Sequence, residues 1–230
     1  MSPPRSGINF ALGQGMLPRT KSILIAVAVS LCASGAFAQN WKDELRMVDN
    51  DLRAQHYAHA RKWSIKLINS MSDHLGTGDA ASYTMALAVA YRALAEEGLN
   101  KPADADWYWH VATSMYPPIV KHDWSPYGEV GRWAADHKDD DLDVTETTVV
   151  PVNKEEPKCP LSAVAGGYYQ PVRVGAIVGT DGTPRCPTLV SQTQAPTLAY
   201  AAFEALKGWQ FQTAARAKYE VTVNFMPPKQ

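Results

Sequence analysis

Apolar residues recur every three or four positions between Trp41 and about Met115, and this spacing predicts a helical first half. The first stripe comprises Trp41, Leu45, Val48 and Leu52. Glycine and proline divide the pattern into separate helices. A second helix is expected to end near His74, just before the sequence LGTGD, and Pro117 is expected to stop a fourth.

The third and fourth predicted helices form the clearest pair. Asp79 is expected to cap the third helix and Pro102 to open the fourth. Ala90 and Ala112 are small residues at positions where two packed helices approach closely. The stretch from Ala80 resembles a tetratricopeptide-type hairpin, which implies a repeat-like helical domain that offers a binding surface to a peptide.

After Pro160 the apolar period changes from helical to two. Val172, Val174, Ala176 and Val178 alternate along one predicted strand, and Asp181-Gly182 provides a turn into a second. A helix follows from Pro196, and a last strand places one set of side chains on one face: Tyr219, Val221, Val223 and Phe225. The expected fold class is therefore α+β, with a helical repeat-like domain before a small antiparallel β-β-α-β sheet domain.

Composition suggests where these parts divide. Six acidic residues fall between Asp136 and Glu146, and prolines follow, which is typical of a solvated linker rather than of a calcium loop. The expected division is a signal peptide over residues 1–38, a helical domain over 39–137, a linker over 138–156 and a sheet domain over 157–230. A short edge strand is expected at Val149-Val150.

The N-terminal segment resembles a secretory signal. Arg19 and Lys21 precede the apolar run that starts at Ile23, and cleavage is expected between Ala38 and Gln39, with an uncleaved membrane anchor as the alternative. Removing residues 1–38 removes three basic residues and no acid, so 19 basic and 23 acidic residues remain, a net charge of −4. This acidic balance argues against nucleic acid as a partner.

Two cysteines remain after that cleavage, Cys159 and Cys186. Because an exported protein meets an oxidising environment, a disulfide between them is expected. The alternative is a pair of buried free thiols.

The order of elements in the second half resembles a known family. The stretch from Val172 ends in the helix and junction AFEALKGWQFQ and the strand VTVNF, and together these are similar to the C-terminal domain of TonB, the energy transducer of bacterial outer-membrane transport. The resemblance covers about residues 157–228. In this pattern Gly208 ends the helix, and Trp209 and Phe211 are expected to seal it against the sheet.

The resemblance implies a periplasmic, non-enzymatic domain that binds a short extended segment of an outer-membrane receptor at a sheet edge. The partner-binding residues that it implies are Lys158, Tyr219, Glu220, Val221, Thr222, Val223, Asn224 and Phe225. The expected function is thus that of an exported adaptor, without a cofactor, that binds a protein or peptide. A membrane is a partner only if the leader is retained.

Two other functions stay open. A TonB-type transducer would keep its leader as an anchor, but the apolar run here has no histidine, which in the family couples the anchor to a proton-driven motor. A cell-envelope enzyme would need a site in the helical domain. Ser64 and Ser162 lack the surroundings of a nucleophile, and no phosphate-binding glycine loop occurs, so catalysis is not expected.

A metal site is not expected either. His56 and His59 could share a helix face, but no further ligand residue lies at a supporting spacing. The aromatic run from Trp107 to His110 is expected to pack mostly into the core, with one residue exposed for contact.

Overall fold

A computed structural model describes residues 41–137, 143–145, 147–191 and 193–225. The predicted signal peptide and part of the predicted linker therefore lie outside the described residues. The described residues form one compact unit, and the α+β class is confirmed, since helices come first and small antiparallel sheets follow. We call residues 41–137 the helical half and residues 143–225 the sheet half.

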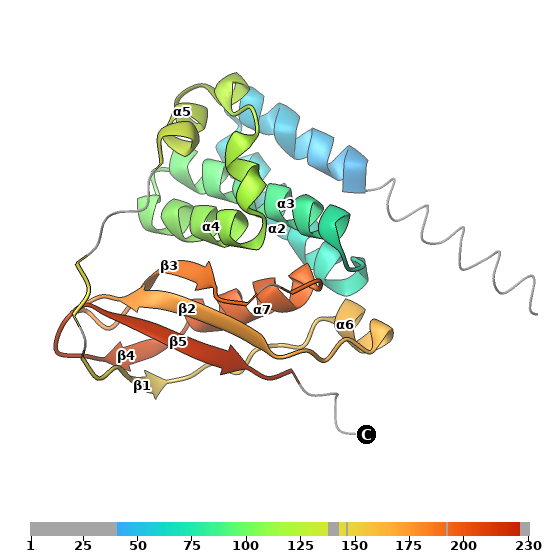
Figure 1. Cartoon of the computed structure of the whole chain (residues 1–230). Helices are drawn as coiled ribbons and strands as arrows, with labels where there is room; N and C mark the ends of the chain where they lie inside the picture. The colour runs from blue at the N-terminus through green and yellow to red at the C-terminus, as the bar shows by residue number, and fades with distance from the viewer. Residues whose placement is uncertain (1–40, 138–142, 146, 192, 226–230) are drawn as a thin grey trace, which may run out of the picture. The chain divides into compact units, whose positions relative to one another are not determined.

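The helical half consists of short antiparallel helices (Figure 1). A helix over residues 41–53 precedes the other elements of this half. These are α2 (Tyr57–His74), α3 (Asp79–Gly98), α4 (Pro102–Met115), the 3-10 turns η1 (Pro117–Lys121) and η2 (Ser125–Tyr127), and α5 (Gly128–Asp136). The end of α2 at His74 and the start of α4 at Pro102 agree with the sequence.

The pairing of α3 with α4 is the main contact of this half. Ala90 and Ala112 are both fully buried, as their small size at a close helix approach predicts. The N-cap of α3 is Gly78 and Asp79 is the first residue of the helix, so the prediction that Asp79 caps the helix is wrong by one position. Asn100, two residues after the end of α3, adopts a left-handed conformation with φ of 61°.

The sheet half carries two small sheets. Its elements are β1 (Val150–Asn153), α6 (Leu161–Gly166), β2 (Val172–Val178), β3 (Pro184–Leu189), α7 (Pro196–Lys207), β4 (Gln210–Gln212) and β5 (Ala217–Val223). The main sheet has the order β3-β2-β5 and is antiparallel throughout. A second sheet pairs β4 with β1, so the segment predicted as a linker contributes a strand.

One face of the main sheet is apolar and packs against α7. Val174 lies opposite Val221, and Val172 lies opposite Val223, so these side chains share that face. Phe203 and Leu206 of α7 are buried in the same core. At roughly 25 cal/mol per Å² of apolar surface, such side chains contribute most of the stability of so small a sheet.

Trp209 and Phe211 close the core between α7 and the main sheet, as the sequence predicts. Both side chains are buried, and the Phe211 ring lies 4.7 Å from the Tyr219 ring. The Trp209 indole donates a hydrogen bond of 2.8 Å to the Glu155 carbonyl. α7 ends at Lys207 and Gly208 is its C-cap, as the sequence predicts, although Gly208 keeps a right-handed helical conformation.

Candidate functional site

The two edges of the main sheet differ in how they are covered. On the β3 side, α4 packs against the strand, and Ser114 of α4 accepts a hydrogen bond from the Leu189 backbone amide. On the other side, β5 pairs with β2 alone in the part of the chain that the structure describes. The outer edge of β5 is therefore the edge at which a further strand could pair.

The register shows which backbone groups of β5 face outward. The Arg173 carbonyl accepts a hydrogen bond from Val190 on the β3 side, so the neighbouring positions Val172 and Val174 face β5. Their partners Val223 and Val221 face β2 in return. Because backbone direction alternates along a strand, the amides and carbonyls of Glu220, Thr222 and Asn224 point away from the sheet.

A groove of about 450 Å³ runs beside this edge. Its lining comes from β5 and the residues that follow it, from Trp209, and from the segment before α6. Its lining residues are Lys154, Glu156, Pro157, Cys159, Trp209, Val221, Thr222, Val223, Asn224 and Phe225. The groove thus combines outward backbone groups with apolar side chains, which is what an extended peptide needs.

Not every predicted binding residue lines this groove. Val221, Thr222, Val223, Asn224 and Phe225 do. Tyr219 instead packs its ring against Phe211 and Trp209, and Glu220 forms an ion pair of 2.6 Å with Arg173 across the sheet.

Lys158 lies in an adjoining groove of about 650 Å³ between α2, α7 and the segment before α6. The two grooves share three lining residues, Glu156, Pro157 and Cys159. Tyr200 and Glu204 of α7 also line the larger groove. A segment bound at β5 could therefore continue past Cys159 into a more polar surface.

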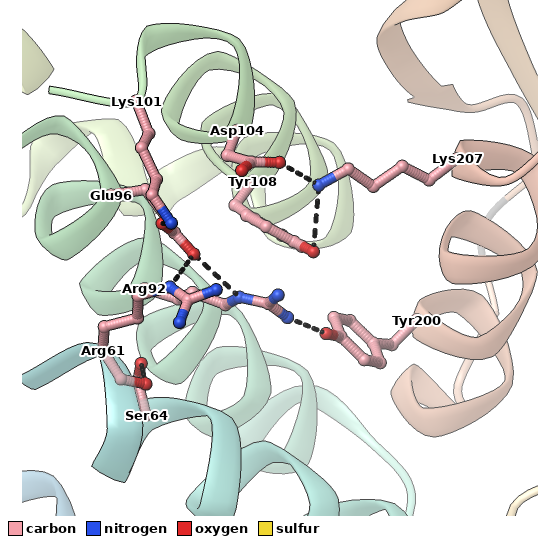
Figure 2. Close-up of polar contacts among 9 residues, drawn as sticks. All are labelled: Arg61, Ser64, Arg92, Glu96, Lys101, Asp104, Tyr108, Tyr200 and Lys207. Carbon is pink, nitrogen blue, oxygen red and sulfur yellow. Dashed lines mark hydrogen bonds and ion pairs between the residues drawn. The ribbon is translucent and has the colours of Figure 1, made fainter. Parts of the chain in front are cut away.

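A buried polar cluster joins the helical half to α7 (Figure 2). Its centre is Glu96 of α3, whose side chain is 0% exposed. Arg61 donates a hydrogen bond of 2.6 Å to Glu96, and Arg92 and Lys101 each lie 3.8 Å from its carboxylate. Three cations thus surround one buried carboxylate, which offsets the free energy of removing its charge from water.

Two contacts extend this cluster to α7. Arg92 donates a hydrogen bond of 2.8 Å to the Tyr200 hydroxyl. Lys207 lies 2.5 Å from Asp104 and 3.1 Å from the Tyr108 hydroxyl, as Figure 2 shows. Burial raises the pKa of Tyr200 and of Tyr108, so both phenols stay neutral and can hydrogen-bond to these cations.

The disulfide between Cys159 and Cys186 that the sequence predicted is not formed, because both thiols are free. The reason is the strand order. Cys159 lines the groove beside β5, whereas Cys186 belongs to β3 at the opposite edge, with β2 in between. Burial raises the pKa of the Cys159 thiol, which keeps it in the protonated form.

The structure brings together a group of residues that the sequence did not single out. Asp106 and His110 lie one turn apart on α4, and Cys186 reaches them from β3, with one ligand-type atom of each residue within 4.8 Å of the others. Burial lowers the pKa of His110, but hydrogen bonds with Asp106 and Cys186 outweigh this effect and raise it to about 10. The Asp-x-x-x-His spacing was the available signal, but nothing local marks Cys186 as the third member.

The residues that the sequence did weigh have structural roles. His59 lies 2.6 Å from Asp51 and accepts a hydrogen bond from Trp63, and His56 lies 3.7 Å from the same aspartate. Ser64 and Ser162 donate hydrogen bonds to backbone carbonyls.

The expectation of one exposed residue in the run from Trp107 to His110 is wrong. All four residues are buried, at 5% exposure or less. The reason is that α4 packs against α3, α7 and β3, which leaves none of these positions facing solvent.

Comparison of the chain with protein-family models, with curated proteins and with solved structures finds no match in any of the three. Among the described residues, no helix is both long enough and apolar enough to cross a membrane.

Proposed function

We propose that this chain is an exported adaptor that binds an extended segment of a partner protein by strand addition at the outer edge of β5. The observation that carries the proposal is the combination of this edge with the adjoining groove. Backbone groups at Glu220, Thr222 and Asn224 would pair with the partner strand, and the groove beside Trp209 would receive its alternate side chains.

The TonB-like interpretation is part of this proposal. The order β2, β3, α7 and β5 agrees with the β-β-α-β pattern on which the resemblance rests, and Trp209 is buried at the junction after α7. By that resemblance the partner would be a segment of an outer-membrane receptor in the periplasm. The α3–α4 pair supports a second, tetratricopeptide-like contact surface in the helical half.

The edge can be tested with peptides selected from a random eight-residue display library against the purified protein. Binding of a selected peptide is then measured by isothermal titration calorimetry for the native chain and for the Thr222→Pro and Thr222→Ala variants. Proline removes the outward amide at Thr222 and is tolerated on an edge strand, whereas alanine keeps that amide. We expect Thr222→Pro to weaken binding by about tenfold or more, as loss of one hydrogen bond and a steric conflict predict.

Two outcomes would contradict strand addition. One is that Thr222→Pro binds the selected peptide as tightly as Thr222→Ala does, with both variants folded by circular dichroism. The other is that the peptide fails to slow hydrogen exchange at the outward amides of Glu220, Thr222 and Asn224.

Export is tested separately, because the adaptor and the membrane-anchored transducer differ at the N-terminus. Protein recovered from cells is fractionated and its first residue is determined. A mature chain that starts at Gln39 in the periplasmic fraction supports the adaptor. An intact leader in the membrane fraction would favour the transducer instead.

A further inference from the structure

The cluster of Asp106, His110 and Cys186 lies where the helical half meets β3. His110 is 5% exposed, and its Nε2 atom lies 3.3 Å from the Asp106 carboxylate. The three side chains offer a carboxylate oxygen, an imidazole nitrogen and a thiol sulfur, all within 4.8 Å of one another. Neither groove described above includes any of these residues.

The backbone at Cys186 is unusual for a strand. The β2–β3 register shifts between Gly175–Thr188 and Ile177–Arg185, so Cys186 and Pro187 lie in a bulge. Cys186 has φ of 44°, a left-handed conformation that residues other than glycine adopt rarely and at a cost in free energy. Bulges of this kind redirect a side chain out of the strand ladder, and here the thiol meets His110 of α4.

A fourth residue lies beside the same carboxylate. His137, directly after α5, places its Nε2 atom 3.1 Å from the same Asp106 oxygen, and its own ring is packed 4.8 Å from the Trp133 ring. Carboxylate ligands of metal ions are commonly oriented by an outer hydrogen-bonding partner of this sort. Three chain segments therefore converge on one point: α4, the end of α5 and the bulge of β3.

We propose that Asp106, His110 and Cys186 bind a zinc ion, with His137 as the partner that orients Asp106. Nitrogen, oxygen and sulfur donors together suit Zn²⁺, which takes four ligands in a tetrahedron. Atoms bound to one such ion lie roughly 3.5 Å apart, so side-chain shifts of about 1 Å would complete the geometry. The fourth position takes a water molecule or a group from outside this cluster.

The donor set favours a metal ion over a thiol nucleophile. A nucleophile has to reach its substrate, but His110 is buried, and Cys186 is partly covered. A zinc ion bound for a structural role does not require that a substrate reach the site. It would also tie β3 to α4 at the edge where Ser114 already bonds Leu189.

The experiment uses the untagged chain after removal of metal with a chelator. Zn²⁺ and Co²⁺ are titrated separately, and bound metal is counted by inductively coupled plasma mass spectrometry. We expect one ion per chain. With Co²⁺ we expect a sulfur-to-metal charge-transfer absorption band and the intense visible bands of tetrahedral cobalt.

Variants identify the ligands. Cys186→Ser should abolish the charge-transfer band, and His110→Gln should weaken Zn²⁺ binding at least 100-fold, while His137→Gln should weaken it about 10- to 100-fold. Cys159→Ser and His59→Gln are the matched controls, and both should leave stoichiometry and spectrum unchanged. Circular dichroism of the metal-free variants establishes that each is folded.

Four results would each overturn the proposal. The charge-transfer band could survive in Cys186→Ser or disappear in Cys159→Ser. Folded native protein could bind no Zn²⁺ at all. Finally, Cys186 could react with iodoacetamide much faster than Cys159 does, and its rate could be the same with and without Zn²⁺. This result would identify an accessible activated thiol instead of a metal ligand.

Discussion

Single residues decide much of how the two halves hold together, and Glu96 is the clearest case. Its side chain is fully buried, yet it carries a charge that Arg61, Arg92 and Lys101 surround. A buried ion pair contributes little compared with apolar packing, but removing Glu96 would leave the largely buried Arg92 without its carboxylate partner. The residue is therefore far more sensitive to substitution than an exposed glutamate.

We expect Glu96→Ala to lower the free energy of unfolding by about 3–5 kcal/mol, because Arg92 would remain in a largely buried position. Urea unfolding followed by circular dichroism measures the change. Glu129→Ala is the control, since the Glu129 side chain is 88% exposed and its loss should change stability by less than about 0.5 kcal/mol. Equal changes in the free energy of unfolding for the two substitutions would show that Glu96 contributes no more to stability than an exposed glutamate does.

Tyr91 gives a prediction for alkaline pH. Burial raises its pKa from 10.0 to about 12, and its hydroxyl accepts a hydrogen bond of 3.1 Å from Tyr127. Since the raised pKa favours the neutral phenol in the folded state, this contribution is complete below pH 10 and is lost as pH rises from 10 towards 12. Over that window the unfolding free energy should fall by about 1.4 kcal/mol per pH unit for this one group.

The measurement is urea unfolding at a series of alkaline pH values. Tyr91→Phe should be less stable at neutral pH, because the hydrogen bond between the Tyr91 and Tyr127 hydroxyls is lost, but should show a shallower alkaline decline. Tyr168→Phe, at a side chain that is 40% exposed, should keep the native slope. A native slope in Tyr91→Phe would mean that Tyr91 does not titrate in this range.

At the scale of elements, the turn between β2 and β3 depends on a glycine. Gly182 has φ of 76°, and its carbonyl accepts a hydrogen bond from the Phe211 amide, which connects the hairpin to β4. An added Cβ would collide with the Phe211 carbonyl oxygen. Both the backbone conformation and the close contact therefore exclude a side chain here.

We expect Gly182→Ala to lower the melting temperature considerably more than Gly167→Ala does. Gly167 also has a positive φ, of 68°, but an added Cβ there meets no atom within 4 Å. Backbone strain costs each variant roughly 1 kcal/mol. Only Gly182→Ala also has the collision with β4, so the difference between the two melting temperatures measures the effect of that collision. Equal melting temperatures, measured by differential scanning calorimetry, would mean that β4 moves away from the added Cβ with no loss of stability.

The elements also show what sequence could predict. Helix boundaries such as His74 and Pro102, and the alternation from Tyr219 to Phe225, follow from local spacing, and the structure agrees. The pairing of β1 with β4 was not predictable, because it joins residues about 60 positions apart that carry no shared pattern.

The two candidate sites also differ in how far the sequence could predict them. The β5 edge was predictable because a regular strand at the end of the chain carries the signal for it. The Cys186 position was not predictable, because a bulge removes the side chain from the strand's alternation, and its partners on α4, His110 and Asp106, lie 76 and 80 positions earlier. The disulfide with Cys159 was the wrong inference because β2 lies between the edges that carry the two cysteines, and the spacing of the cysteines does not reveal the strand order.

For the whole molecule, the polar cluster around Glu96 and the packing of α4 against β3 join both halves into one compact unit. We therefore expect one cooperative unfolding transition, with equal calorimetric and van 't Hoff enthalpies. Two domains separated by a solvated linker would instead give two transitions.

Fluorescence can assign the transition to each half. Six of the seven tryptophans belong to the helical half, and Trp209 is the exception. The tryptophan emission of the Trp209→Phe variant therefore reports on the helical half alone. This emission should change at the same urea concentration as the circular dichroism of that variant. Separate midpoints would show that the halves unfold independently.

The unequal edges of the main sheet also limit how copies of this protein could associate with one another. Since α4 covers β3, only β5 is available to a second copy, and two β5 edges meeting antiparallel form a closed pair related by a two-fold axis. Such a pair has no edge of the main sheet left for a third copy. Assembly through this sheet therefore ends at a dimer rather than continuing into a fibre, and a partner segment bound at β5 would compete with that dimer.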